Sequence, residues 1–212
     1  MTRTASARGG RRRSTIEEIR RAELVDAAIG IIDQVGFDRT TVREIANAAD
    51  AAAGSVHYYF KTKGDLLRAA FVETERRFQA RVRDELADLT GLEKLTKLIA
   101  LCFPTDRELL PSWNVEIDLW QQAARQADFR ALFDEVNRSW IQLIDETLQE
   151  AVSAGELASD LVTKQFALEL ATLIDGLTLY CRVTTRVDAE LAARLLTSRI
   201  DGLRMPAAAR AT

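Results

Sequence analysis

Residues 36–67 read GFDRTTVREIANAADAAAGSVHYYFKTKGDLL, and the strongest structural signals of the chain lie in these residues. Thr41 precedes an apolar-periodic segment and has Glu44 three residues later, so each side chain can satisfy a free backbone amide of the other residue. This capping box predicts that a helix of about two turns begins here. The buried face of the helix is expected to comprise Val42, Ile45, Ala46 and Ala49, which recur at helical spacing.

A second short helix is predicted over residues 53–60, after a turn at Asp50. Aspartate tolerates a left-handed backbone better than most residues, which suits a turn among small side chains. Val56 and Phe60 lie four residues apart and are the expected core anchors. The remaining side chains are small or carry hydrogen-bonding tips on flat apolar bodies, so we interpret them as a reading surface: Ala53, Gly54, Ser55, His57, Tyr58 and Tyr59.

A third helix is predicted to begin at about Lys63, because Thr62 and Asp65 form a second capping box. The N-terminus of this helix, together with Lys61 and Lys63, suits a phosphate group. One bracing helix, one reading helix and flanking amides and lysines make up the layout of a helix-turn-helix that reads the major groove of DNA.

These residues resemble the TetR family of bacterial repressors, whose pattern here is TT-x-x-x-IA-x-x-AGVS-x-G-x-[LV]-Y-x-YF-x-x-K-x-x-L. The chain departs from this pattern at Asp50, where the family has a turn glycine, at Ala51 and Ala52 in place of Val-Ser, and at His57 in place of tyrosine. Without the serine the reading helix lacks an N-cap and is expected to be looser until DNA is bound. The matching residues are Thr40, Thr41, Ile45, Ala46, Ala49, Gly54, Val56, Tyr59, Phe60, Lys63 and Leu66.

The layout predicts contacts with a double-stranded DNA operator. Three of the predicted contact residues have a second interpretation: His57 as an exposed surface residue, Arg43 as a solvated helix residue, and Tyr59 as a partly structural one. The full predicted set is Thr41, Arg43, Ala53, Gly54, Ser55, His57, Tyr58, Tyr59, Lys61 and Lys63.

Composition predicts an all-α protein, since 212 residues contain three prolines and ten glycines, with no alternating apolar runs. The formal net charge is −3, but it is unevenly distributed. Residues 1–70 hold 12 Lys and Arg against 9 Asp and Glu, a balance of +3, and the rest of the chain has a balance of −6. The N-terminal end is therefore the expected DNA-binding end.

Neither a cofactor nor a metal ion is expected. Cys102 and Cys181 have no metal or redox spacing, and His57 is the only histidine. No apolar run approaches the roughly 18 residues of a membrane span, and the N-terminal arginines precede no apolar segment of a signal peptide. We expect a cytoplasmic protein without a membrane partner.

Four segments are predicted along the chain: a disordered basic tail over 1–13, a helix-turn-helix domain over 14–62, a helical ligand-binding and dimerisation domain over 63–205, and a disordered tail over 206–212. The five arginines of the first segment leave two interpretations open. It is either a solvated tail or an arm that reaches a minor groove or phosphates. The helix from Lys63 should run from the DNA-binding head into the body, so it is the expected lever between them.

Apolar periodicity predicts further helices and a loop beyond the reader. The loop is expected over 104–111, between a helix and Pro111. The helix at the N-terminus of the chain should begin near Ser14 and end at Gly36, and the helices of the body should cover 63–89, 92–103, 112–125, 128–155, 163–184 and 189–203.

Aromatic and acidic side chains in the body suggest a pocket for a small-molecule effector. Aromatic rings with carboxylates would suit a cationic ligand. The same aromatic residues could instead be ordinary core. The candidate pocket residues are Phe103, Trp113, Glu116, Ile117, Trp120, Phe133, Trp140, Asp175 and Tyr180, with Asp118 as a further carboxylate.

The two C-terminal helices carry apolar residues on more of their surface than one core contact needs. The simplest interpretation is a homodimer formed through a four-helix interface, and the alternative is a purely intrachain core. The segment from Leu173 to Leu177 and the preceding helices resemble the BetI-type, choline-responsive branch of the TetR family. The resemblance implies a dimer interface and a small-molecule pocket in this region.

The leading hypothesis is therefore a ligand-responsive repressor that a small molecule releases from a palindromic operator. One rival is a DNA-binding regulator controlled by protein contact without a small-molecule ligand. A second rival is an all-helical enzyme, although the sequence offers no nucleophile with a base, no metal set and no phosphate loop.

Overall fold

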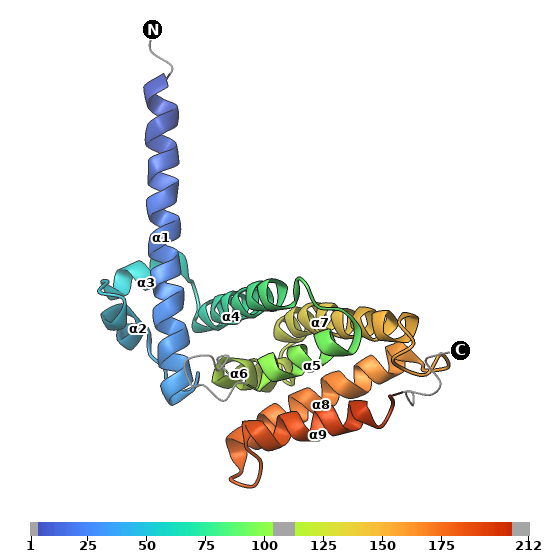
Figure 1. The fold of residues 1–212 in the computed structure, drawn as a ribbon. Coiled ribbons are helices and arrows are strands. Elements are labelled where there is room, and N and C mark those ends of the chain that lie inside the picture. The colour runs from blue at the N-terminus through green and yellow to red at the C-terminus, as the bar shows by residue number, and fades with distance from the viewer. Residues whose placement is uncertain (1–3, 104–112, 205–212) are drawn as a thin grey trace. The chain divides into compact units, whose positions relative to one another are not determined.

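The computed structural model describes residues 4–103 and 113–204, with side chains from Ile16 onward, and its regular structure is helical within these stretches (Figure 1). The expectation of an all-α fold is confirmed. The helices are α1 (Thr4–Val35), α2 (Val42–Ala48), α3 (Ala53–Tyr59), α4 (Lys63–Leu86), α5 (Gly91–Cys102), α6 (Trp113–Ala123), α7 (Ala127–Ser153), α8 (Thr163–Val183) and α9 (Ala189–Asp201).

The chain forms two compact units. Unit 1 comprises Met1–Arg76 and Ser112–Gln122, and unit 2 comprises Arg77–Pro111 and Ala123–Thr212. The predicted domain boundary lies between residues 62 and 63, where the helix-turn-helix ends. The compact units instead divide inside α4, after Arg76, and most of α6 belongs to unit 1 together with the helix-turn-helix. The loop expected over 104–111 and the tail expected over 206–212 lie outside the described residues.

The start of α1 differs from the expectation. The helix begins at Thr4, whereas we expected residues 1–13 to lack regular structure and a helix to begin near Ser14. Arginine and alanine have high helix propensity, and extending an existing helix requires no new nucleus. The C-terminal end agrees with the prediction: Gly36 has a φ of 81°, and its N–H donates to the Ile32 carbonyl over 2.8 Å.

Unit 1 has its own core between α1, α2, α3 and the first part of α4. The predicted anchors Val56 and Phe60 are 1% and 3% exposed. Helix α6 contributes Trp113, Val115 and Leu119, which are also buried. The other buried apolar side chains of this unit include Leu24, Val25, Ala28, Ile32, Ile45, Ala46, Leu66, Leu67, Ala70 and Phe71.

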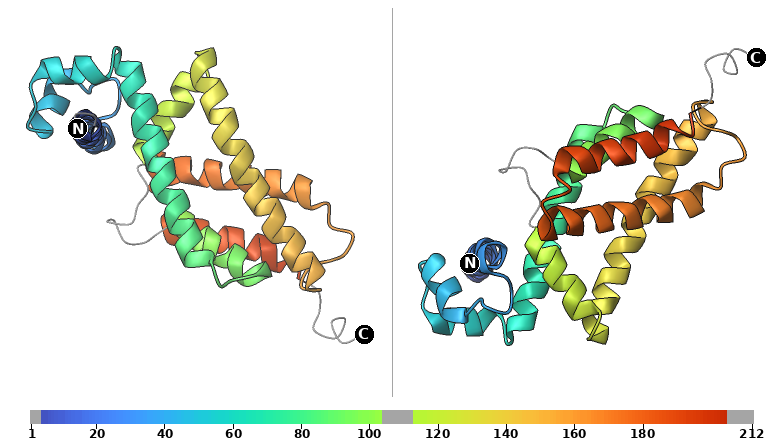
Figure 2. Two further views of the ribbon diagram at one scale, coloured as in Figure 1. Left: turned by 90° about the horizontal axis from the view of Figure 1, so that it is seen from above. Right: turned by 90° about the horizontal axis from the view of Figure 1, so that it is seen from below.

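Unit 2 is a bundle in which α7 packs against α5 and α8, and α9 packs against α8 and α5 (Figure 2). The inward faces of α8 and α9 are apolar at helical spacing, as the sequence predicted. Buried side chains on these two helices include Phe166, Leu170, Ile174, Leu196 and Ile200. No helix in the described ranges combines the length and apolar character that crossing a bilayer requires.

The N-terminus of α5 shows how unit 2 fixes one helix end. Gly91 has a φ of 55°, and a Cβ atom at this position would clash with a Glu156 carboxylate oxygen. That oxygen accepts a hydrogen bond from the Leu92 N–H over 2.8 Å, and Lys94 pairs with Glu150 over 2.9 Å. Glycine is favoured here because the backbone is left-handed, and a larger residue would also require the Glu156 carboxylate to move.

Candidate DNA-binding surface

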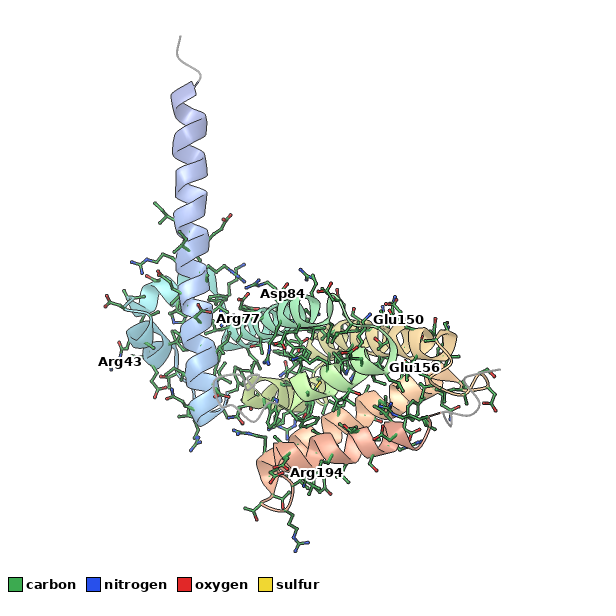
Figure 3. The ribbon with its side chains drawn as sticks, in the orientation of Figure 1. Arg43, Arg77, Asp84, Glu150, Glu156 and Arg194 are labelled. Atoms are coloured by element: carbon green, nitrogen blue, oxygen red, sulfur yellow. The ribbon has the colours of Figure 1, made fainter. Side chains whose placement is uncertain are left out.

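The predicted capping box at the start of α2 is confirmed. The Glu44 N–H donates to Thr41 Oγ1 over 3.2 Å, and the Thr41 N–H donates to Glu44 Oε2 over 2.9 Å. Hydrogen bonds from Thr41 hold the pKa of Glu44 below its usual value. Thr41 and Arg43 are exposed at this helix end, and Arg43 points away from the head (Figure 3).

The turn between α2 and α3 has the predicted left-handed residue. Asp50 has a φ of 47°, and the Ala51 N–H donates to the Ala46 carbonyl over 2.8 Å. Ala52 then occupies the N-cap position of α3 with φ −74° and ψ 144°, and has no side-chain hydrogen bond to the helix. The reading helix is therefore seven residues long and uncapped by a side chain, as the departure at Ala52 predicted.

Ala52→Ser should stabilise this helix, because a serine hydroxyl in the same backbone conformation can accept a hydrogen bond from a free amide of the first turn. We expect the free energy of unfolding of the head to rise by about 1 kcal/mol, measured by urea denaturation. Ala48→Ser, at an exposed position inside α2, is the control and should lower stability slightly. Equal effects of both substitutions would contradict the N-cap assignment.

Helix α3 presents two different faces. Val56 and Phe60 are buried, whereas His57 is exposed and Tyr58 is 72% exposed. The Tyr58 ring packs edge-on against Tyr59, with 4.9 Å between the ring centroids. Tyr59 is half-buried, which fits its partly structural interpretation.

The first turn of α3 leaves room for another molecule. Ala53 and Gly54 are exposed, and Ser55 is half-buried. A Cβ atom on Gly54 would have no atom within 4 Å. Together with His57 and Tyr58, these small residues form an exposed strip that can approach a base edge or phosphate closely.

The start of α4 also has the predicted second capping box. The Thr62 N–H donates to Asp65 Oδ2 and the Asp65 N–H donates to Thr62 Oγ1, both over 3.0 Å. Lys61 is exposed beside this helix N-terminus. Lys63 instead donates from Nζ to the Asp38 carbonyl over 3.0 Å. Lys63 therefore has a structural contact in the DNA-free protein, which sequence periodicity could not reveal.

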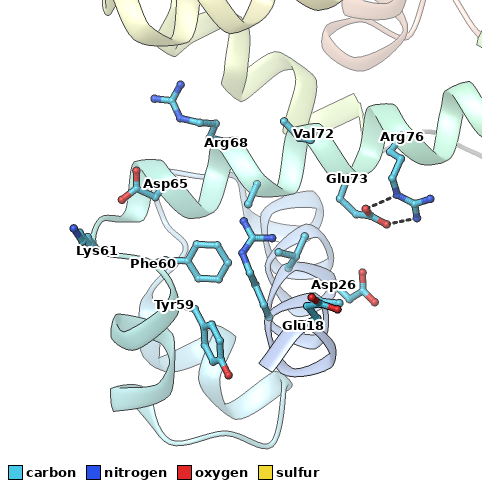
Figure 4. A pocket seen from close by; sticks show the side chains of 14 residues that line it. Glu18, Asp26, Tyr59, Phe60, Lys61, Asp65, Arg68, Val72, Glu73 and Arg76 are labelled. Carbon is cyan, nitrogen blue, oxygen red and sulfur yellow. Dashed lines mark hydrogen bonds and ion pairs between the residues drawn. The ribbon is translucent and has the colours of Figure 1, made fainter. Parts of the chain in front are cut away.

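A groove of about 720 Å³ lies between α1, the end of α3 and the first part of α4 (Figure 4). Its charged side chains have both signs, and Glu73 and Arg76 pair through two hydrogen bonds of 2.8 Å. The Arg21 guanidinium lies over the Phe60 ring, 5.1 Å from its centroid. This balance of charge does not favour an anion, and the Arg21 contact instead holds Phe60 at the end of the reading helix.

The candidate pocket residues are divided between the two units. Trp113, Glu116, Ile117 and Trp120 lie on α6 in unit 1. The others lie in unit 2: Phe103, Phe133, Trp140, Asp175 and Tyr180.

The pocket candidates of unit 2 differ in exposure. Phe103 is buried, Phe133 and Trp140 are half-buried, and the Trp140 ring packs against Phe78 with 5.8 Å between centroids. Tyr180 is 57% exposed, on the outer face of α8, and its pocket role stays a prediction. Burial raises the pKa of Asp175 to about 6.

Sequence reasoning missed one carboxylate in the body. Asp145 on α7 is 8% exposed, and Oδ2 accepts a hydrogen bond from Gln149 over 3.0 Å. Oδ1 has no hydrogen-bond partner among the described residues. The nitrogen Nε1 of Trp120 is likewise buried without a partner in the described part of the chain. An acidic residue on an amphipathic helix is usually solvated, so no local signal marked Asp145.

Two family descriptions match different parts of the chain. Residues 24–70 match bacterial regulatory proteins of the tetR family. Residues 91–204 match the family described as BetI-type transcriptional repressor, C-terminal. The first match covers the helix-turn-helix, and the second covers most of unit 2.

Individual relatives agree with these matches. The chain is 27% identical over 190 residues to the HTH-type transcriptional regulator BetI of Cronobacter sakazakii, covering 87% of this chain and 90% of that protein. It is 29% identical over 142 residues to the fatty acid metabolism regulator protein of Bacillus subtilis, covering 66% and 71% of the two chains.

A solved structure shares the fold over nearly the same length. A transcriptional regulator from Saccharomonospora viridis, crystallised in complex with choline, superposes with a TM-score of 0.82 at 23% identity, covering 88% of this chain and 98% of that one.

Proposed function

Because the chain belongs to the tetR family of bacterial regulatory proteins, with a C-terminal domain of the BetI type, we propose that it is a repressor whose dimer leaves a palindromic operator when a small cation binds its body. Membership in the family makes the protein a transcriptional regulator with a DNA-binding helix-turn-helix, and not an enzyme.

The exposed strip on α3 carries the DNA-binding part of the proposal. Val56 and Phe60 hold the helix on the head, so His57 and Tyr58 remain free of any core role. A reading helix needs this division, since side chains that specify bases must reach out from a rigid support. The exposed Lys61 and the amides at the start of α4 would hold phosphates beside it.

The outer faces of α8 and α9 support a homodimer. Large apolar side chains are exposed here, and burying them against a second copy of the chain would stabilise a complex. Leu168, Gly176 and Val183 share one side of α8 at helical spacing. The exposed apolar residues of the two helices are Leu168 at 50%, Leu173 at 40%, Tyr180 at 57%, Val183 at 67% and Leu195 at 49%.

Two carboxylates of unit 2 support a cationic effector. The buried Asp145 has one oxygen without a partner among the described residues, and burial disfavours the charged form of Asp175. A cation that binds beside either carboxylate would compensate for the hydration that this carboxylate loses on burial. The choline complex of the Saccharomonospora viridis regulator and the BetI relatives make choline the first probe. Pocket roles for Trp113, Glu116, Ile117 and Trp120 stay predictions.

Asp175→Asn should change the pH dependence of stability. The folded-state pKa of about 6 lies above the ordinary value of 3.8, so the folded protein favours the protonated carboxyl. The stability that the protonated Asp175 carboxyl gives to the folded state is fully present below pH 3.8 and is lost as the pH rises through 6. Between pH 4 and 7 the wild-type free energy of unfolding should fall by at most about 3 kcal/mol more than that of the variant.

Urea denaturation at several pH values measures this difference, and Asp134→Asn, at an exposed position on α7, is the matched control. Parallel pH curves for wild type and Asp175→Asn would contradict the assignment.

Calorimetric titration with choline tests the effector. If ionised Asp175 holds the cation, wild-type affinity should fall about tenfold from pH 7 to pH 5, because binding then requires loss of a proton. Asp175→Asn should bind choline weakly at both pH values, and choline should release wild-type protein from operator DNA. Equal choline affinity in wild type and Asp175→Asn, or no release from DNA, would exclude this effector site.

A further inference from the structure

Helix α6 has an unusual place in the chain. The segments before and after it, 77–111 and 123–212, both belong to unit 2, yet residues 112–122 belong to the compact unit of the DNA-binding head. Its buried side chains Val115 and Leu119 are both 0% exposed. Helix α6 thus lies between two unit 2 segments in the sequence but packs in unit 1, with the DNA-binding head.

Polar side chains of α6 hold the main chain between α1 and α2. Asp118 Oδ2 accepts a hydrogen bond from the Phe37 N–H over 2.6 Å. Asn114 Nδ2 donates to the Asp33 carbonyl. Asp118 also lies close to Gly36, where a Cβ atom would be 3.9 Å from Oδ2. Asn114 and Asp118, one helical turn apart, therefore bind the main chain just before and just after the C-terminal end of α1.

The link between α1 and α2, residues 36–40, is also held by a side chain of α4 and by a hydrogen bond inside the link. The Lys63 ammonium lies over the Phe37 ring, 4.4 Å from its centroid, and donates to the Asp38 carbonyl. Thr40 Oγ1 donates to the Gly36 carbonyl over 2.8 Å. The next residue, Thr41, caps α2. A shift of residues 36–40 would therefore move the start of the helix that braces the reader.

We propose that Asp118 and Asn114 are positioning residues for operator binding, which set the α1–α2 link and, through it, the placement of α2 and α3. This inference rests on the proposed DNA-binding function.

Burial explains why the Asp118 contact is specific. Burial raises the pKa of Asp118, while the hydrogen bond from Phe37 lowers it, and Asp38 and Lys63 are the charged groups that act on it. A partly dehydrated carboxylate keeps its charge best where an N–H is directed at it. Asparagine retains an acceptor oxygen of similar shape, whereas alanine leaves the Phe37 N–H without this partner.

The test compares Asp118→Ala, Asp118→Asn and the control Gln121→Ala, an exposed position on the same helix. Fluorescence anisotropy measures full-length protein on operator and scrambled duplexes. We expect Asp118→Ala to lose about tenfold in operator affinity, with scrambled-duplex affinity unchanged. Asp118→Asn and Gln121→Ala should bind as wild type does. Hydrogen exchange of the DNA-free protein should be faster at residues 36–41 in Asp118→Ala alone.

Wild-type operator affinity in Asp118→Ala would overturn the positioning role. The role would also be overturned if Asp118→Ala lost the same affinity for both duplexes and Asp118→Asn also failed to bind as wild type does. Unchanged hydrogen exchange at residues 36–41 in Asp118→Ala would overturn the positioning role whatever the affinities for the two duplexes are. Failure of the wild-type protein to prefer its operator would instead contradict the proposed function, so the two failures are distinguishable.

Discussion

The double substitution His57→Ala and Tyr58→Ala lowers operator affinity by about 100-fold, if each side chain contributes roughly 1–3 kcal/mol of base discrimination. Both side chains are exposed, with Tyr58 at 72%, and the core contacts of α3 are made by Val56 and Phe60. The variant should therefore keep the wild-type free energy of unfolding. Affinity for a scrambled duplex, which depends on phosphate contacts, should fall much less.

Fluorescence anisotropy on the two duplexes and urea denaturation measure these quantities. Gln79→Ala, at an exposed position on α4 outside the predicted DNA surface, is the control and should bind as wild type does. Wild-type operator affinity in the double variant would show that α3 does not read the DNA. A large loss of stability would show that these side chains support the fold.

Gly176→Arg should convert the proposed dimer into monomers and lower operator affinity by about 100-fold or more, because a monomer loses the effective concentration that the linked second head provides. Gly176 lies on the outer side of α8, and a Cβ atom there would have no atom within 4 Å. The monomer can therefore accept the larger side chain. A symmetric interface formed by this side of α8 would have to bury both introduced charges.

Light scattering gives the mass in solution, and anisotropy gives the affinity. Gln142→Arg adds the same charge at an exposed position on α7 and should remain dimeric. A Gly176→Arg protein that stays dimeric at wild-type concentrations would place the interface elsewhere. A monomeric variant with full operator affinity would contradict the need for two linked heads.

The helix-turn-helix could be predicted because its signals are local. The capping boxes join residues three apart, Thr41 with Glu44 and Thr62 with Asp65, so sequence spacing alone identifies them. The left-handed turn at Asp50 follows from residue type and from the small residues around it. The α3 anchors follow from helical spacing.

Contacts between distant parts of the chain could not be predicted in this way. Phe37 and Asp118 are 81 positions apart, and no periodicity connects a loop amide with an acid on a later helix. Lys63 matched the family pattern and looked like a phosphate contact, yet its ammonium lies over Phe37. Tyr180 and Asp145 show the same limit, because helix periodicity does not say which neighbour covers a given side of an apolar helix.

The most direct test of the account is binding of the full-length protein to the intergenic DNA upstream of its own coding sequence, across a range of salt concentrations, with a scrambled duplex as control. We predict a preference for the upstream DNA, two protein chains per symmetric site, and an affinity that falls log-linearly with salt as phosphate contacts are screened. Equal affinity for both duplexes at every salt concentration would contradict sequence-specific reading by α3.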